Sequence, residues 1–242
     1  MEKIGNWFYQ DLQQTSSTND SVLDFLNEVH APCIVSAAAQ TNGRGRLGRK
    51  WEAATGNLYV SFVYPLETKK IGHHVLLSGL AVLQTIKTFL SNASVRVKWP
   101  NDVFVNGKKI SGILFEKGPG NYWVMGIGIN VKKTPIVQNP MYEITSLKEN
   151  GAETDRLKVL RILVKEFDFL KAQYEKHGFH FLKSLWIDNA YNRGKNVIIK
   201  QNGIETEGVL LDLDDGGLIL KTEQGQKHIL VGDLFEGKNE NG

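Results

Sequence analysis

Hydrophobic positions recur along this chain at two different spacings, which together predict a mixed α+β protein. Residues 57–64 are apolar at every second position, as in a strand, whereas apolar residues in 74–90 recur at near-helical spacing. The dipeptide Asn106-Gly107 between two apolar runs indicates a hairpin. The same reading predicts strands over 34–39, 95–99, 103–105, 110–115 and 122–131, and helices over 156–174 and 179–191. We therefore expect a mixed sheet flanked by helices.

The pattern changes near residue 195, after which only short apolar runs occur. These runs predict strands over 196–200, 205–213, 218–222 and 226–231. Short strands at even spacing are typical of a small β-barrel, here of about fifty residues. We accordingly predict two domains, residues 1–190 and residues 191–242.

Composition narrows the class of protein. With 242 residues, 41% of them hydrophobic, the chain is long enough to bury a core without disulfides. A net charge of +3 is too small to indicate nucleic-acid binding. The single cysteine, Cys33, sits in an apolar run and suits a buried position in a reducing cytosol. Neither a signal peptide nor a run of about 18 apolar residues is visible, so we expect a cytoplasmic protein without a membrane span.

Residues 43–48 formally match the dinucleotide fingerprint Gly-x-Gly-x-x-Gly, but the context argues against it. A strand and not a helix is predicted next, and Arg49-Lys50 stands where a phosphate-binding P-loop needs Lys-Ser/Thr. What remains is a loop with four cations and no compensating acid, which would repel one another unless an anion were bound. Three interpretations stay open: an anion-binding lid, a mobile basic loop and a nucleic-acid contact. For the last of these, Trp51 is the only nearby aromatic residue, so no series of stacking side chains is evident.

A second concentration of chemistry begins with Lys-Trp-Pro-Asn-Asp at 98–102, where a strand ends. An ordinary Asx turn is the plain alternative. In the next strand, alternation places Lys109, Ser111 and Ile113 on one face, and an interior lysine is costly unless it meets an anion. Gly112 marks a close approach to the backbone, either by a ligand or by tight packing of the sheet.

Together these motifs resemble the biotin–protein ligase family. The arginine loop and Lys-Trp-Pro-Asn-Asp are the most specific of them, and the β-rich tail looks like the family's SH3-like C-terminal domain, so the resemblance covers nearly the whole chain. The matching stretches are Ser17 to Asn19, Gln40 to Trp51, residues 98–102, residues 107–114 and Gly126-Ile-Gly-Ile-Asn130. The resemblance implies a class II synthetase-like catalytic domain followed by an SH3-like barrel. Lipoate and octanoate ligases share that catalytic fold without this loop motif, and they remain an alternative, as does a non-catalytic nucleotide-binding module.

The family's reaction has two steps. Biotin is adenylated with ATP and magnesium to biotinyl-5'-AMP, and the biotinyl group is then transferred to a lysine of a biotin carboxyl carrier protein or domain. The resemblance implies no tightly bound prosthetic group, no metal beyond nucleotide-bound magnesium, and a monomer or homodimer. Some relatives carry an N-terminal helix-turn-helix domain. Here the first motif begins at Ser17, which leaves no room for one, so we expect the ligase-only form without sequence-specific DNA binding.

The resemblance also assigns residues. Its catalytic candidates are Lys109, which would neutralise the carboxylate and α-phosphate, Arg46, and Asp102, which would position or deprotonate the incoming lysine. Its biotin-binding candidates are Ser17, Thr18, Asn19, Gln40, Gly43, Arg44, Lys109 and Gly112. Its ATP-binding candidates are Arg44, Arg46, Arg49, Trp51, Lys98, Asn101 and Asn130.

Overall fold

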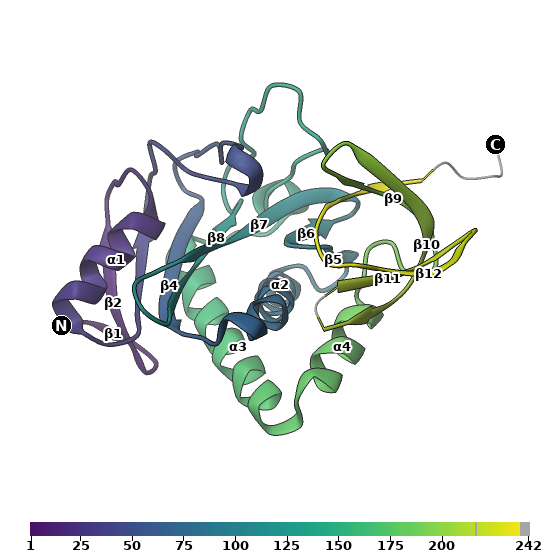
Figure 1. The fold of residues 1–242 in the computed structure, drawn as a ribbon. Helices are drawn as coiled ribbons and strands as arrows, with labels where there is room; N and C mark the ends of the chain where they lie inside the picture. The colour runs from purple at the N-terminus through teal and green to yellow at the C-terminus, as the bar shows by residue number, and fades with distance from the viewer. Residues whose placement is uncertain (216, 238–242) are drawn as a thin grey trace.

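A computed structural model of the chain describes residues 1–215 and 217–237 (Figure 1). Its main sheet has eight strands in the order β1-β2-β3-β4-β8-β7-β6-β5, and β2 pairs with β3 in parallel while the other pairs are antiparallel. The mixed sheet flanked by helices is therefore confirmed. The strands are β1 (Lys3–Ile4), β2 (Trp7–Leu12), β3 (Cys33–Ala37), β4 (Leu58–Pro65), β5 (Val95–Lys98), β6 (Asp102–Val105), β7 (Lys108–Lys117) and β8 (Tyr122–Ile129).

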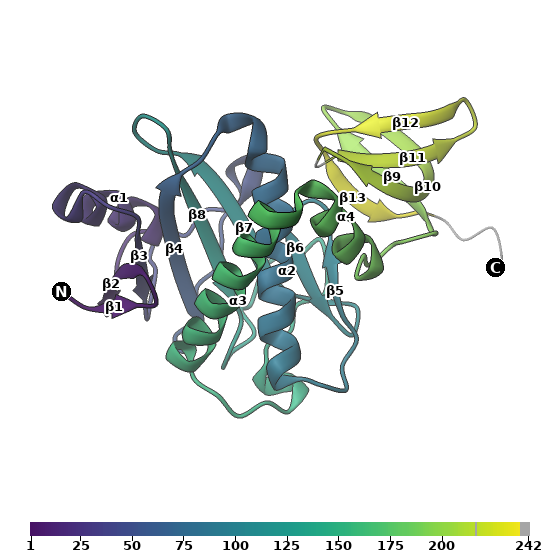
Figure 2. The same cartoon turned by 90° about the horizontal axis from the view of Figure 1, so that it is seen from below.

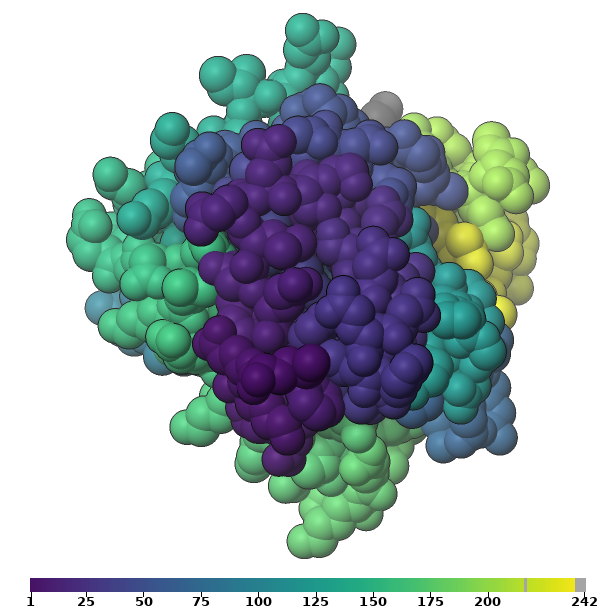
Figure 3. Space-filling model, turned by 90° about the vertical axis from the view of Figure 1, so that its left-hand side faces the viewer, coloured from purple at the N-terminus to yellow at the C-terminus, as the bar shows by residue number. Residues whose placement is uncertain are grey.

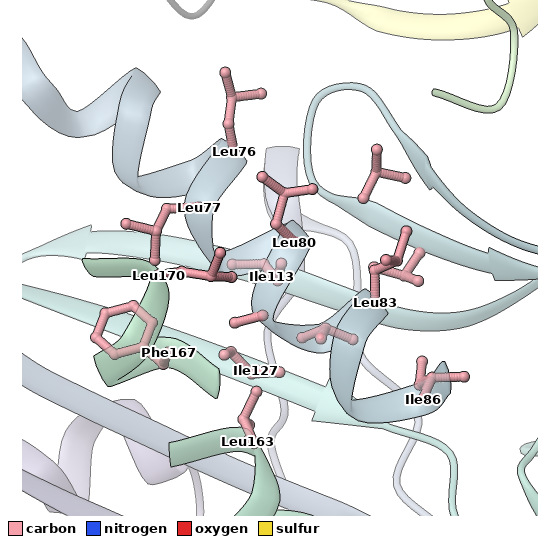
Figure 4. Packing of buried hydrophobic residues seen from close by; sticks show 14 of the residues in the cluster. Leu76, Leu77, Leu80, Leu83, Ile86, Ile113, Ile127, Leu163, Phe167 and Leu170 are labelled. Carbon is pink, nitrogen blue, oxygen red and sulfur yellow. The ribbon is translucent and has the colours of Figure 1, made fainter. Parts of the chain in front are cut away.

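Helices cover both faces of this sheet. α2 (Ile71–Phe89) and α3 (Arg156–His177) cross one face, and α4 (Phe179–Asp188) packs beside them (Figure 2). The core on this side interleaves leucines of α2 with Phe167 of α3 and with Ile113 and Ile127 of the sheet (Figure 4). Since burying an aliphatic or aromatic side chain contributes about 1.5–3 kcal/mol, this layer is the main source of stability.

α1 (Thr18–Val29) covers the opposite face with a smaller apolar cluster. Val22, Phe25 and Leu26 pack there on Cys33, whose burial raises the pKa of its thiol to about 12, so the predicted core position of Cys33 is confirmed. Seen from the side on which α1 lies, the N-terminal residues are in front and the C-terminal residues are to one side (Figure 3). The sequence reading missed α1 and the strands β1 and β2.

The chain after α4 forms a separate five-stranded antiparallel sheet in the order β12-β11-β10-β9-β13. We call residues 191–237 the C-terminal unit. The four predicted strands are present, and a fifth, β13, was missed. The strands are β9 (Asn196–Gln201), β10 (Ile204–Asp214), β11 (Gly217–Thr222), β12 (Gly225–Ile229) and β13 (Asp233–Glu236). Residue 216 and residues 238–242 of the predicted second domain lie outside the described residues.

Candidate active site

A pocket opens between the start of α1, the arginine loop (residues 43–50), strands β6 to β8 and the start of β13. It gathers nearly all the residues that the sequence singled out, although they come from five separate motifs. Gly43 and Lys98 are the two that do not line it. The lining includes Ser17, Thr18, Asn19, Gln40, Arg44, Arg46, Arg49, Trp51, Asn101, Asp102, Lys109, Gly112 and Asn130.

One side of the pocket, the α1 wall, is a dense hydrogen-bond network. The amide of Gln40 accepts hydrogen bonds from the backbone N–H of Thr18 at 2.7 Å and from its hydroxyl at 3.0 Å. Asn19 accepts from the Ser61 hydroxyl at 2.5 Å and donates to Glu116 at 2.6 Å. Gly126 lies beneath Asn19, where a Cβ would be 2.3 Å from the amide oxygen. The α1 wall consists of Ser17, Thr18, Asn19, Gln40 and Arg44.

Arg44 belongs to this wall because two carboxylates hold it there. It makes a two-pronged contact with Asp20 at 2.7 and 2.9 Å, and it also donates to Glu116 at 3.0 and 3.2 Å. These hydrogen bonds lower the pKa of Asp20 and raise that of Arg44. The expectation that the loop has no compensating acid is therefore wrong, because acids distant in sequence fold against it.

The opposite side, the β13 wall, consists of Arg46, Arg49, Asn101, Asp102, Lys109 and Asp233. Arg46 reaches three acceptors: the amide oxygen of Asn101 at 3.2 Å, the carbonyl of Gly232 at 3.2 Å and Asp233 at 3.4 Å. Arg49 donates to the second oxygen of the same Asp233. Burial lowers the pKa of Arg46, and the charge of Asp233 opposes that effect. Lys50, the fourth loop cation, pairs with Glu52 at 3.0 Å.

Lys109 faces the pocket and forms an ion pair with Asp102 at 2.7 Å, with its ammonium 5.6 Å from the centre of the Trp51 ring. The predicted alternation around it is wrong. Val103 pairs with Ser111 but Phe104 pairs with Lys109, so Ile110 is an extra residue in β7. Such a bulge adds one residue to the strand, so the side chains on its two sides no longer follow a single alternation. As a result Lys109 lies beside Gly112, where a Cβ would be 3.5 Å from its Cε atom, while Ile110 and Ile113 both enter the core.

Trp51 covers the pocket floor. A Cβ on Gly128 would lie 2.5 Å from the indole, and one on Gly112 would lie 2.9 Å from it, so only glycines at both positions let the ring approach the sheet. The close approach predicted at Gly112 is thus made by Trp51. Gly43 packs under the Trp51 carbonyl, where a Cβ would be 2.6 Å away. The indole N–H is buried without a hydrogen-bond partner among the described residues.

Two asparagines also line the pocket. Asn101 donates to the Ile113 carbonyl at 2.6 Å while its oxygen accepts from Arg46. Asn130 donates to the Thr145 carbonyl at 3.0 Å. Their oxygens are potential ligands for a hard cation such as magnesium. Within residues 1–215 and 217–237 no group of three histidine, cysteine or acidic side chains is placed to hold a metal.

Lys98 lies behind the pocket and not in it. It is 3% exposed, and its ammonium donates to the Tyr142 hydroxyl at 2.9 Å and to the Leu234 carbonyl of β13. It also sits 4.1 Å from the centre of the Tyr142 ring. Burial lowers the pKa of Lys98 to about 8. In this structure the lysine joins the main sheet to the C-terminal unit through Tyr142 and Leu234, which both line the pocket. Its role in binding ATP stays a prediction.

The segment between β8 and α3 also contributes to the pocket, through Pro135, Val137, Pro140, Met141, Tyr142 and Ile144. Backbone hydrogen bonds attach it to Lys109, whose N–H donates to the Glu143 carbonyl at 2.8 Å and whose carbonyl accepts from Thr145 at 2.9 Å. Ile136 in this segment is 95% exposed. The sequence reading missed the segment because it has neither strand nor helix periodicity.

Comparison with known proteins agrees with this geometry. The model of the biotin/lipoate A/B protein ligase family matches residues 11–131. The biotin–[acetyl-CoA-carboxylase] ligase of Paracoccus denitrificans is 30% identical over 93% of this chain and 99% of that protein. The bifunctional ligase/repressor BirA of Bacillus spizizenii is 33% identical over 95% of this chain and 73% of that protein.

Among solved structures, the biotin protein ligase of Aquifex aeolicus in complex with biotin and ATP superposes with a TM-score of 0.83. It is 29% identical to this chain and covers 96% of it and 99% of its own length. Fold and sequence agree along almost the entire chain. The chain belongs to the biotin/lipoate A/B protein ligase family.

Proposed function

We propose that this protein is a biotin–protein ligase, which activates biotin with ATP to biotinyl-5'-AMP and transfers the biotinyl group to a lysine of a carboxylase's biotin carboxyl carrier domain. One observation supports this above the others. A single pocket joins a hydrogen-bonding wall whose one cation is paired with carboxylates, suited to a urea ring, to a cationic wall, suited to phosphates. Relatives named as biotin ligases align over nearly the full chain.

In the first step an oxygen of the biotin carboxylate attacks the α-phosphorus of ATP, and the bond to the bridging oxygen breaks to release pyrophosphate. Two anions must approach each other, so preorganised positive charge lowers the barrier. Lys109 is our candidate for that charge because it faces the pocket as part of the β13 wall. Arg46 and Arg49 would hold the phosphates, Trp51 would lie near the adenine, and Asn101 and Asn130 would face the nucleotide and its magnesium.

The α1 wall would bind the ureido ring. A buried urea needs both donors and acceptors at fixed positions, and the network through Ser17, Thr18, Asn19 and Gln40 offers both. Arg44, held by two carboxylates, would close this end of the site over biotin. Gly112, with Gly43 behind it, would set how closely the indole and biotin approach the sheet.

In the second step the neutral amine of the acceptor lysine attacks the carbonyl carbon of the mixed anhydride and expels AMP, losing its extra proton. Asp102 is our candidate to position that amine, and its ion pair with Lys109 distinguishes it from an ordinary turn aspartate. We further propose that the C-terminal unit is an SH3-like barrel, with the domain boundary near residue 190. A monomer or homodimer in the cytoplasm without sequence-specific DNA binding remains our prediction. No helix in the described residues is long and apolar enough to cross a membrane.

The test is biotin-dependent exchange of labelled pyrophosphate into ATP in the presence of magnesium, with lipoate and octanoate run in parallel. Exchange with biotin alone is expected. Exchange with lipoate or octanoate instead would assign the chain to the other activities of its family and overturn the role given to the α1 wall. Nucleotide binding without exchange for any of the three acids would indicate a non-catalytic module.

A further inference from the structure

The first residue of β13, Asp233, contacts two arginines of the loop although it is more than 180 residues away in sequence. Its Oδ1 atom lies 3.4 Å from Arg46, and its Oδ2 atom accepts from Arg49. The carboxylate is largely buried, with 18% of the side chain exposed. The two guanidinium groups repel each other, and besides burial the charge of Arg49 contributes to the lowered pKa of Arg46. Such repulsion is stronger near a protein surface than in bulk water. A shared carboxylate offsets that repulsion.

We infer that Asp233 is a positioning residue for adenylation. It holds Arg46 and Arg49 together at the pocket mouth as a paired donor for the polyphosphate of ATP. This inference rests on the proposed function. Each guanidinium carries five N–H donors. The described contacts use three donors of Arg46 and two of Arg49, one of each for Asp233, so both arginines retain donors for phosphate oxygens. The C-terminal unit thereby contributes a side chain to the site.

The position of Asp233 is fixed from both flanks. On one side, the ammonium of Lys98 and the hydroxyl of Tyr142 both donate to the carbonyl of Leu234. On the other, Gly232 has φ +150° and a Cβ there would lie 2.6 Å from Ile199, which excludes any larger residue. Its carbonyl accepts from Arg46 at 3.2 Å. The start of β13 is therefore paired with β9 and fastened to Lys98 at the end of β5, so the carboxylate is not carried by a free strand end.

The experiment measures the KM for ATP in biotin-dependent pyrophosphate exchange, with the thermal midpoint recorded for each variant. Asp233→Asn should raise the KM for ATP about tenfold with a smaller change in kcat, because a charge-assisted contact that orders the donors is lost. Asp233→Glu, which keeps the carboxylate, should have a KM for ATP close to that of the wild type. Glu223→Gln, which removes the same charge from an exposed turn of the same unit, should leave the KM for ATP unchanged.

A double variant separates positioning from folding. If Asp233 acts through the arginines, Asp233→Asn combined with Arg49→Ala should raise the KM for ATP by less than the product of the two single effects. The inference would be overturned by an unchanged KM for ATP in Asp233→Asn, or by fully multiplicative effects in the double variant. It would also be overturned by a lowered KM for ATP in Asp233→Asn, which is expected if the carboxylate competes with phosphate. Absence of exchange in the wild type would instead refute the proposed function.

Discussion

The two walls of the pocket differ in how their charges are compensated. On the α1 wall a single cation, Arg44, meets two carboxylates, Asp20 and Glu116. On the β13 wall three cations, Arg46, Arg49 and Lys109, share two carboxylates, Asp102 and Asp233. The first arrangement leaves no cation to attract an anion, whereas the second keeps an excess of positive charge.

This difference indicates which part of a substrate each wall suits. A neutral polar ring is recognised by hydrogen bonds whose partners are already fixed, as they are around Gln40 and Thr18. A polyphosphate needs positive charge that is held in place and not cancelled. Substitutions on the α1 wall should therefore change the binding of biotin. Substitutions on the β13 wall should change the binding of ATP and the rate of adenylation.

The largest expected effect is on the β13 wall. Lys109→Met should lower the rate of pyrophosphate exchange by about two to three orders of magnitude, as with the loss of other preorganised electrostatic groups. The control is Lys108→Met, which removes the preceding lysine, exposed and paired with Glu143 at 2.8 Å. Exchange near the wild-type rate in Lys109→Met would remove this residue from the chemistry and leave the wall a binding surface alone.

A substitution on the α1 wall should separate biotin from ATP. Gln40→Ala removes the acceptor for two Thr18 hydrogen bonds, and we expect a loss of about 1–3 kcal/mol in biotin affinity with little change in ATP affinity. Titration calorimetry with each ligand measures both, and Thr41→Ala at the neighbouring exposed position is the control. Equal losses for biotin and ATP would show that the two walls do not act independently.

Local patterns were sufficient to predict most of the fold and nearly all of the pocket lining. Alternation identified β4, and the Asn106-Gly107 turn identified the β6–β7 hairpin, because both signals lie within a few residues. α1 escaped because its buried residues include Thr18 and Asn19, which face the pocket and interrupt the apolar period. A helix that serves a polar site on one part of its inner face has a weak helical signal.

The rest depended on contacts that sequence spacing does not contain. The bulge at Ile110 changed which face Lys109 occupies, and alternation alone had assigned it to the face of Ser111. The acids that pair with the three loop arginines come from α1, β7 and β13, far away in the sequence, so the loop appeared uncompensated. Lys98 belonged to a matching motif, yet its side chain turns toward Leu234.

Closure of the arginine loop should depend on the part of the loop that contacts β13. Arg46→Gly removes the contacts to Asn101, Gly232 and Asp233, so biotinyl-adenylate should be released or hydrolysed about tenfold faster, since an open loop admits water. The lifetime of the enzyme-bound intermediate can be followed after rapid removal of free ATP. Leu47→Ala, at the next and 74% exposed position, should retain the wild-type lifetime. An unchanged lifetime in Arg46→Gly would mean that the Arg44 end alone holds the loop.

The smallest effect concerns Lys98, which supports the β13 wall from behind. Its pKa is lowered to about 8 by burial, so between that value and its ordinary pKa of 10.5 the unfolded chain binds more protons than the folded one. Stability from this group therefore rises with pH across that window, and the burial of the charge costs most below pH 8.

Relative to Lys98→Met, the wild type should gain about 1 kcal/mol in unfolding free energy between pH 7 and 9. Denaturant unfolding of both proteins at the two pH values measures the difference. No gain of the wild type relative to Lys98→Met would mean that the pKa of Lys98 is not lowered in the folded protein.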